Sequence, residues 1–349
     1  MIIKELCYDN LGIARATIVS DSGKEYITCA DSELYRAWCT CPSYIFSKDG
    51  SSCKHITFLF NNLEYKKMVK NKNLNFVEIG CKTIDDILGG GVPYGIVTAT
   101  FGEPTSGKSL FGHQCGLANI AATGKNTILI ETEGLRTYDV RMIQYKFMDR
   151  WGLNKETIDS KYKVIHTMGD IQLKSFQKLF QLFGYIVTDE ISKNGKYTLK
   201  FTSCTPKLKE KELEETSMII LDSLTKPVKD SVGSNTQNLP ARAELVQRLF
   251  GKLYDVASRY NIAVVVNHHA SINPMMPFGR DLGKPYGGNP VLYNSKYALE
   301  FIDAPKKLQN ETGWGQETRR VKLLRRPDVP QDDQLHPVRL KKDYGFTDE

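Results

Sequence analysis

The chain has 349 residues, of which 41% are hydrophobic and 25% charged, close to the average for globular proteins. This length suits one α/β domain of about 250 residues and a smaller unit. We see no run of about 20 apolar residues, which a membrane span would need, and no signal-peptide layout, so we expect a soluble, cytoplasmic protein. The formal net charge of +7 favours a polyanionic partner without requiring one.

The N-terminal region carries a predicted hairpin and a cysteine cluster. Two β-rich runs within residues 12–30 flank a turn-forming segment at 21–24, which predicts a β-hairpin. Three thiolates and one imidazole then follow at a spacing that suits a closed tetrahedral zinc site. So short a segment has little other core to stabilise it, although reduced thiols with an incidental histidine are the alternative. The predicted zinc ligands are Cys39, Cys41, Cys53 and His55.

The lysine-rich segment 66–75 predicts a linker, which leaves residues 1–65 as one domain and residues 76–349 as another. In the second domain a capping-box sequence starts a short helix at Thr83, and glycines end it at 89–91. Strand candidates then alternate with helical patterns, which predicts an α/β fold with a mostly parallel sheet covered by helices. The expected strands are 95–101, 126–131, 163–166, 218–222, 263–267 and 298–302.

Residues 185–216 interrupt this alternation. Two β-rich runs flank the turn signal Asn194-Gly195, and a charged segment follows them. We predict an inserted hairpin.

A Gly-x-x-x-x-Gly-Lys-Ser motif lies between a β-rich run and a helical segment. Its glycines let consecutive N–H groups curl around phosphate oxygens, and the following helix N-terminus adds a favourable dipole. Lys108 supplies positive charge, and Ser109 offers its hydroxyl to Mg²⁺. We therefore predict a nucleotide site that uses Gly102, Glu103, Thr105, Ser106, Gly107, Lys108 and Ser109.

Two acidic residues follow apolar strands. Asp222 ends the run 218–222, where it is expected to hold Mg²⁺ through water. Glu133 follows the run 126–131, where it would polarise the attacking water. A plain strand end for Asp222 and a solvated loop carboxylate for Glu133 are the alternatives.

In family order, the segments 80–91, 101–109, 131–134, 221–225 and 287–292 resemble the ATPase core of the RecA/RadA recombinases. The resemblance covers residues 76–349. It implies a RecA-like fold, hydrolysis of ATP with Mg²⁺, and activation of water by the acid that matches Glu133.

The same resemblance implies two loops that bind single-stranded DNA, near residues 226–240 and 271–288. The second loop contains Phe278, Arg280 and Lys284, which are suited to stack on bases and contact phosphates. A surface loop without this function is the alternative.

Three single positions also follow from the resemblance. Arg141 resembles an arginine that stacks on adenine when one extra residue is allowed after Glu133. Pro330 resembles a proline in a cap over the nucleotide of a neighbouring subunit, although Arg325 stands where archaeal and eukaryotic relatives usually carry an acid. His269 stands where the family usually has a glutamine that senses the γ-phosphate, and a histidine can donate a similar hydrogen bond with altered pH dependence. A proline-ended strand and a strand-end histidine are the alternatives.

The cysteine cluster after the hairpin resembles a SWIM zinc finger over residues 12–65, a module associated with DNA or protein binding. This unit is not the helical DNA-binding domain usual before such a core, which favours an accessory paralogue. We expect a nucleoid-associated recombinase paralogue whose slow ATPase is stimulated by DNA, with a partner recombinase or as a homo-oligomer. A KaiC-like ATPase or kinase acting on proteins, and a non-catalytic adaptor that recruits a recombinase, are the alternatives.

Overall fold

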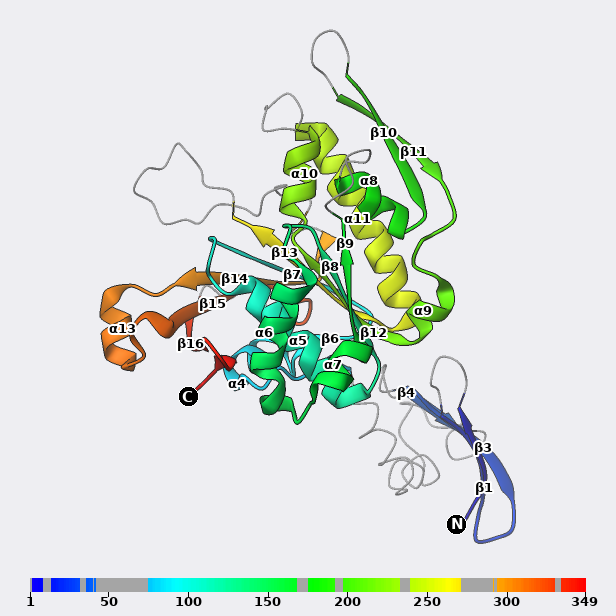
Figure 1. Cartoon of the computed structure of the whole chain (residues 1–349). Helices are drawn as coiled ribbons and strands as arrows, with labels where there is room; N and C mark the ends of the chain where they lie inside the picture. The colour runs from blue at the N-terminus through cyan, green and yellow to red at the C-terminus, as the bar shows by residue number, and fades with distance from the viewer. Residues whose placement is uncertain are drawn as a thin grey trace. The chain divides into compact units, whose positions relative to one another are not determined.

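The computed structural model of the chain divides into two compact units, residues 1–75 and residues 76–349 (Figure 1). Among the residues that it describes, no helix combines the length and the apolar character needed to cross a bilayer. The described residues are 2–8, 14–31, 36–39, 41, 75–167, 175–191, 197–232, 239–270, 291, 294–329 and 334–349.

The first unit contains a four-stranded antiparallel sheet in which strands adjacent in sequence are paired. The pair β2–β3 covers the segment for which the sequence predicts a hairpin. Its turn is closed by the N–H of Ser20, which donates to Lys24 O at 2.8 Å, and Gly23 has a left-handed φ of 77°. The strands are β1 (Ile2–Tyr8), β2 (Ala14–Val19), β3 (Glu25–Asp31) and β4 (Arg36–Cys39).

The second unit is built on a nine-stranded sheet with the order β17-β16-β15-β14-β7-β13-β12-β8-β9. The strands from β14 to β9 are parallel, and β15 to β17 extend one edge with antiparallel pairing. The predicted mostly parallel sheet is therefore confirmed. Its strands are β7 (Val97–Gly102), β8 (Asn126–Glu131), β9 (Tyr162–His166), β12 (Thr216–Asp222), β13 (Ala263–His269), β14 (Tyr297–Asp303), β15 (Thr318–Arg325), β16 (His336–Lys341) and β17 (Gly345–Thr347). Two short strands, β5 (Phe76–Val77) and β6 (Val92–Pro93), pair separately.

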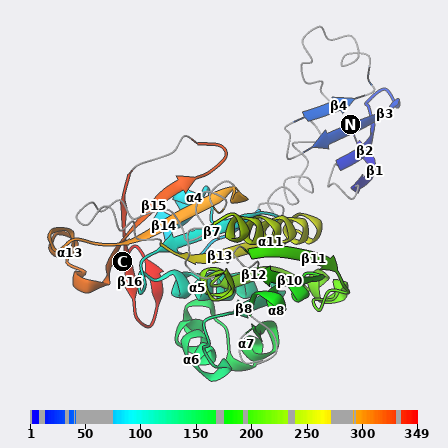
Figure 2. The ribbon, with the colours of Figure 1, turned by 90° about the horizontal axis from the view of Figure 1, so that it is seen from above.

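Helices cover both faces of this sheet (Figure 2). Successive side chains of a strand point to opposite faces, so Met218 of β12 packs in the cluster of α5, α6 and α7, whereas Ile219 packs in the cluster of α8 and α11. The helices are α4 (Lys82–Leu88), α5 (Lys108–Thr123), α6 (Thr137–Phe147), α7 (Lys155–Lys161), α8 (Ser175–Leu182), α9 (Glu210–Glu214), α10 (Thr225–Val232), α11 (Leu239–Tyr260) and α13 (Lys306–Thr312), with 3-10 turns η1 (Met148–Trp151) and η3 (Gly315–Glu317).

An antiparallel ribbon of β10 (Tyr185–Ile191) and β11 (Tyr197–Ser203) lies where the sequence predicts an inserted hairpin. Val187 of this ribbon is buried in the core cluster of α8 and α11. The guanidinium of Arg248, on α11, lies 4.3 Å from the ring centroid of Phe201. The ribbon is thus packed onto the helical layer of the second unit.

Candidate nucleotide site at the carboxyl ends of the parallel strands

The predicted phosphate loop connects the end of β7 to the start of α5, and its backbone requires glycine at two positions. A Cβ at Gly102 would lie 2.2 Å from the main-chain oxygen of Phe301. Gly107 has a φ of 103°, and a Cβ there would lie 2.7 Å from the ring of Phe346. Thr105 is also left-handed, with a φ of 66°. The loop therefore has the tight curvature that lets backbone N–H groups surround a phosphate.

Lys108 is the first residue of α5, and its ammonium is enclosed by the loop itself. Its Nζ donates to Glu103 O at 2.7 Å, to Gly102 O at 3.1 Å and to the Ser106 hydroxyl at 3.3 Å. Burial lowers the pKa of Lys108, and nearby carboxylates, first Asp222, oppose that shift. The charge is thus held at the loop by acceptors that a phosphate could replace.

Asp222 ends β12 beside the phosphate loop. Its carboxyl is buried, and burial raises its pKa, whereas hydrogen bonds from Asn267 and Ser109 lower it. The structure therefore brings together the hydroxyl and the carboxyl that the sequence assigns to Mg²⁺. Both are oxygen donors, which is the ligand class that Mg²⁺ prefers, so the pair fits this ion.

Asn267 is a site residue that sequence reasoning missed. It lies on β13, where Thr100 of β7 is its register partner, and it is fully buried. Its Oδ1 accepts from the Thr100 hydroxyl at 2.5 Å, and its Nδ2 donates to Lys108 O at 3.3 Å. With the hydrogen bond to Asp222, this amide joins two strands to the start of α5. In the sequence, the signal for this residue is that Asn267 directly follows the apolar run 262–266.

Glu133 and His269 meet at this edge of the sheet. Glu133 Oε1 lies 2.8 Å from His269 Nε2 and accepts from the Ser223 hydroxyl at 2.6 Å. The bond from His269, more than any other cause, lowers the pKa of Glu133 to about 2. The main-chain N–H of His269 donates to the Thr225 hydroxyl at 2.8 Å. The expected water-activating acid is therefore ionised at neutral pH and touches the expected γ-phosphate sensor.

The chain is similar in sequence to known ATPases and recombination proteins. The sequence model of the KaiC ATPase family matches residues 77–190, which include the phosphate loop and Glu133. A DNA repair and recombination protein RadA from Ignicoccus hospitalis is 25% identical over 239 residues, which are 65% of this chain and 62% of that protein. A RadB from Methanococcoides burtonii is 25% identical over 251 residues, which are 72% of this chain and 89% of that protein.

The crystal structure of a RadB recombinase superposes with a TM-score of 0.54 at 20% identity, covering 78% of this chain and all of that one (100%). The second unit has a RecA-type fold. The resemblance to the RecA/RadA core is thereby confirmed for the fold. The chain spans less than two thirds of the length of the RadA relative, 62%.

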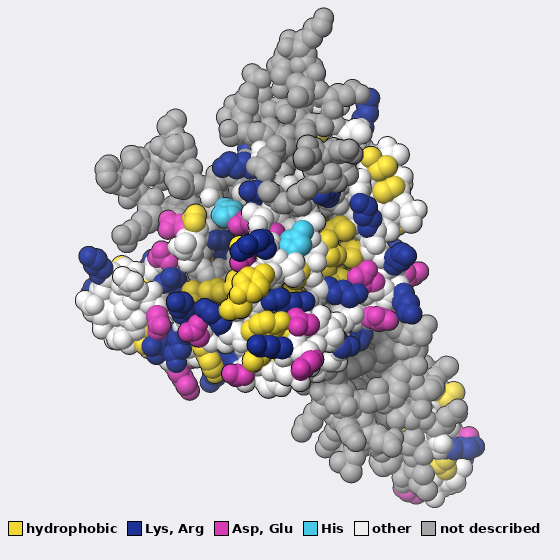
Figure 3. Space-filling model, in the orientation of Figure 1, with side chains coloured by type: hydrophobic (Ala, Val, Ile, Leu, Met, Phe, Trp, Pro, Cys, Tyr) yellow, Lys and Arg dark blue, Asp and Glu magenta, His cyan; other side chains and the backbone are white. Residues whose placement is uncertain are grey.

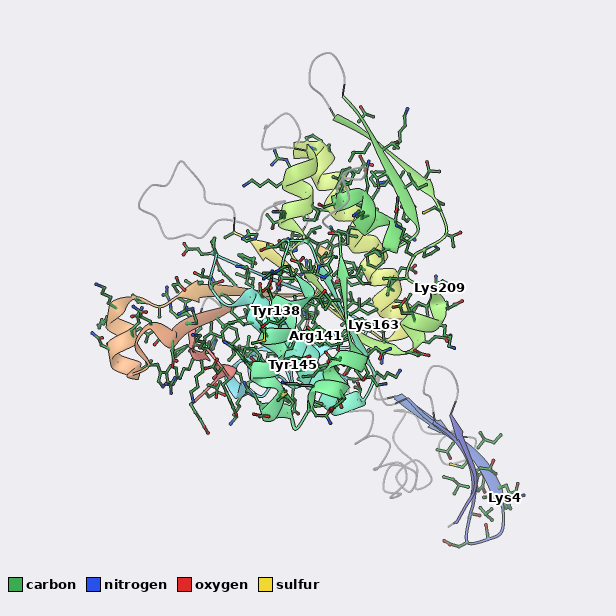
Figure 4. All side chains as sticks on the ribbon, viewed as in Figure 1. Lys4, Tyr138, Arg141, Tyr145, Lys163 and Lys209 are labelled. Carbon is green, nitrogen blue, oxygen red and sulfur yellow. The ribbon has the colours of Figure 1, made fainter. Side chains whose placement is uncertain are left out.

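Arg141, expected at the adenine, lies on α6 and is partly buried (Figure 4). Its guanidinium donates to Gln144 Oε1 at 2.7 Å and to Tyr162 O at 2.8 Å, and its Nε lies 2.9 Å from Asp159 Oδ1. These partners tie α6 to α7 and β9. Stacking of Arg141 on a base stays a prediction, and it would require the guanidinium to leave these partners.

Large apolar side chains are exposed at the start of α6. Leu135 precedes the helix and Tyr138 and Met142 lie within it, and their exposed fractions are 39%, 67% and 42%. Figure 3 shows hydrophobic side chains gathered over this helix. Tyr138 is the most exposed of these three side chains, and its ring is open to solvent.

The other expected contacts of the RecA-like core lie outside the described residues, namely Pro330 of the cap and Phe278, Arg280 and Lys284 of the second DNA-binding loop. Within the predicted cap segment, residues 325–330, Arg326 pairs with Asp328 at 2.6 Å and donates to the main-chain oxygen of Ile87 in α4 at 3.2 Å.

The zinc prediction falls largely outside the described part of the chain. Cys39 ends β4, Cys41 is buried and not in a disulfide, and Cys53 and His55 are outside the described residues. Among the described residues, no group of three or more His, Cys, Asp or Glu side chains is placed to hold a metal ion. The zinc site stays a prediction.

Proposed function

We propose that residues 76–349 bind MgATP and hydrolyse it slowly, and that the chain is an ATP-dependent recombinase paralogue assisting homologous recombination and DNA repair. The observation that carries this proposal is the convergence of Lys108, Asp222 and Glu133 at one edge of the sheet, from three different elements. The relatives named DNA repair and recombination proteins support the recombination role.

In this proposal different groups of the chain bind the phosphates, hold Mg²⁺ and orient the attacking water. The loop N–H groups and Lys108 bind the phosphates, and Ser109 and Asp222 would hold Mg²⁺, which supplies positive charge to the phosphate oxygens. Glu133, already ionised, accepts a hydrogen bond from the attacking water and orients it. His269, which ends β13 and contacts that carboxylate, couples the nucleotide site to the segment that follows β13. This segment begins the proposed DNA-binding loop.

The partners proposed from the resemblance are single-stranded DNA, at the segments near 226–240 and 271–288, and a recombinase or further copies of this chain. The first segment is not a loop throughout, because α10 spans Thr225–Val232 and α11 begins at Leu239. Zinc held by Cys39, Cys41, Cys53 and His55 would stabilise a SWIM-like finger in the first unit, because three thiolates and one imidazole suit that ion. Adenine stacking by Arg141 and nucleotide capping by Pro330 belong to the same proposal.

The test is steady-state ATP hydrolysis by the purified full chain, with and without single-stranded DNA. Turnover that rises with DNA supports the coupled recombinase paralogue. A KaiC-like role has one specific observation in its favour, the family match over residues 77–190. Label transferred from γ-phosphate to protein, without any response to DNA, would support that alternative, and ATP binding without turnover would support an adaptor.

A further inference from the structure

The short segment from Glu131 to Gly134, here named the Glu133 loop, is held by a buried carboxylate at its own start. Glu131 ends β8, and its side chain is 3% exposed. Its Oε1 accepts the main-chain N–H of Glu133 at 2.7 Å and that of Gly134 at 3.0 Å, and its Oε2 also lies 3.1 Å from the Gly134 nitrogen. The loop is thus folded back onto the side chain that precedes it.

A histidine from the neighbouring strand lies next to this carboxylate. His166 ends β9, the register partner of β8 at this level, and its Nδ1 lies 3.4 Å from Glu131 Oε2. Its Nε2 lies 2.8 Å from the hydroxyl of Thr137, the first residue of α6. The Glu131 carboxylate therefore lies between the loop and the edge strand of the sheet.

A second set of hydrogen bonds, made by Thr132, holds the middle of the loop. The Thr132 hydroxyl donates to Ser223 O at 2.5 Å and accepts from Ser223 N at 2.8 Å, and Thr132 N donates to Asp222 O at 2.9 Å. Thr132 is fully buried. The Thr132 hydrogen bonds do not involve the Glu131 carboxylate, so they still join the loop to the end of β12 when that carboxylate is removed.

The hydrogen bonds of Thr132 and those of Glu131 fix different parts of the loop. Thr132 sets where the loop meets β12, whereas Glu131 sets the direction of the backbone at Glu133 itself, because its oxygens bind the N–H groups of Glu133 and the next residue. An ionised carboxylate only accepts hydrogen bonds, so it can satisfy both N–H groups at once. Without it, those groups must find water or turn away.

We infer that Glu131 is a positioning residue, whose carboxylate clamps the Glu133 loop so that the Glu133 side chain reaches Ser223 and His269 and lies within electrostatic range of Lys108. The inference rests on the proposed ATP hydrolysis. It assigns no substrate contact to Glu131. Its role is to fix the orientation of the group that orients water.

The experiment compares wild type, Glu131→Ala and Glu131→Asp in the full chain. Two readouts are needed: steady-state ATP hydrolysis, and hydrogen exchange of the Glu133 and Gly134 amides by NMR. In Glu131→Ala we expect kcat to fall about tenfold or more, with KM for ATP changed less than about threefold, since an ill-placed base loses part of a contribution of about 10²–10⁴. Both amides should exchange faster.

Glu131→Asp should rescue both readouts, because aspartate side chains readily accept from main-chain N–H groups two and three residues ahead. His166→Ala is the matched control: it removes the contact behind the carboxylate and leaves both N–H bonds, so we expect kcat within about threefold of wild type. If Glu131→Ala does not fold, Glu131→Gln, which keeps one acceptor oxygen, takes its place with a smaller expected loss in the same direction.

Unchanged amide exchange in Glu131→Ala, or wild-type kcat in that variant, would overturn the inference. So would a loss confined to KM. Absence of ATP turnover in wild type would instead contradict the proposed function, and amide exchange would then still decide whether Glu131 holds the loop.

Discussion

The imidazole of His269 and the carboxylate of Glu133 share a hydrogen bond of 2.8 Å between Nε2 and Oε1, although 136 positions separate them in the sequence. The bond assigns the tautomer, because an ionised carboxylate can only accept, so Nε2 carries the proton. This bond is the first cause of the low pKa of Glu133. The proposed sensor, His269, and the proposed water-activating acid, Glu133, are thus in direct contact.

Replacing His269 should therefore move the acid limb of the pH–rate profile. When the hydrogen bond that lowers it most is lost, the pKa of Glu133 rises from about 2 toward its ordinary value of 4.5. Because the base acts only when ionised, kcat/KM of His269→Ala should begin to fall at higher pH than in wild type. His269→Gln, which retains a donor, should shift it less. Acid limbs that coincide in wild type and His269→Ala would contradict this account.

Lys108→Ala should abolish ATP turnover, with a fall in kcat/KM of at least about 100-fold, because the ammonium is the cation that the loop holds for the phosphates. The oxygens of Gly102 and Glu103 that now bind the ammonium would then face the phosphates without it. Lys163→Ala is the matched control: it removes a partly buried lysine of β9 that pairs with Glu212 of α9, and it should keep wild-type rates. Undiminished hydrolysis by Lys108→Ala would show that turnover occurs elsewhere.

Much of this site could be predicted from sequence because its parts have local signals. The phosphate loop is contiguous, and Asp222 and Glu133 each follow an apolar run that forms a parallel strand, so the shared edge of the sheet follows. The strand at 126–131 has the predicted bounds, and the others shift by one or two residues, because pairing partners decide where a ladder ends.

Other features have no local signal. The antiparallel extension β15 to β17 depends on pairing at the far edge of the sheet, which no periodicity reports. Asn267 acquires its role from Thr100 of β7 and Lys108 of α5, which are distant from it in sequence and contact it only in the folded protein. Arg141 was placed by resemblance to a motif with one extra residue, and its actual partners come from three elements packed in space.

Asn267→Ala should both destabilise the fold and weaken ATP binding. The substitution removes the hydrogen bonds that Asn267 makes with the Thr100 hydroxyl, the Lys108 carbonyl and Asp222. Because these groups are buried, the free energy of unfolding should fall by about 1–3 kcal/mol. Urea denaturation and an ATP titration measure the two effects. Asn119→Ala is the control: this asparagine is equally buried, and its amide bonds Tyr94, Thr127 and Ser217 away from the loop. Equal losses of ATP affinity in both variants would deny Asn267 a specific role.

His113 should make the fold sensitive to mild acid. It is buried on α5 beside the Tyr162 hydroxyl, and burial lowers its pKa to about 4 from 6.5. Between pH 6.5 and pH 4, His113 is protonated in the unfolded chain and neutral in the folded chain. The free energy of unfolding therefore falls as the pH drops through this range, by up to about 1.4 kcal/mol per pH unit.

Urea denaturation of wild type and His113→Gln at pH 7 and pH 5 measures that contribution, because the comparison cancels groups that titrate alike in both proteins. One of these is Asp85, whose pKa burial raises to about 7 and whose effect has the opposite sign. The variant should lose less stability than wild type between the two pH values. Parallel losses would exclude His113 as the cause.

Gly102→Ala should prevent ATP binding, because its Cβ would lie 2.2 Å from Phe301 O, a main-chain atom of β14 that cannot rotate away. Either β14 or the phosphate loop must shift, and the Lys108 ammonium, which contacts Gly102 O, would shift with the loop. Gly251→Ala is the matched control: it lies in α11 with open space around the added methyl, and should stabilise the protein by about 0.5–1 kcal/mol. Both are measured by ATP titration and urea denaturation. Normal ATP affinity in Gly102→Ala would mean that the loop tolerates the displacement, and that its observed shape is not what binds the phosphates.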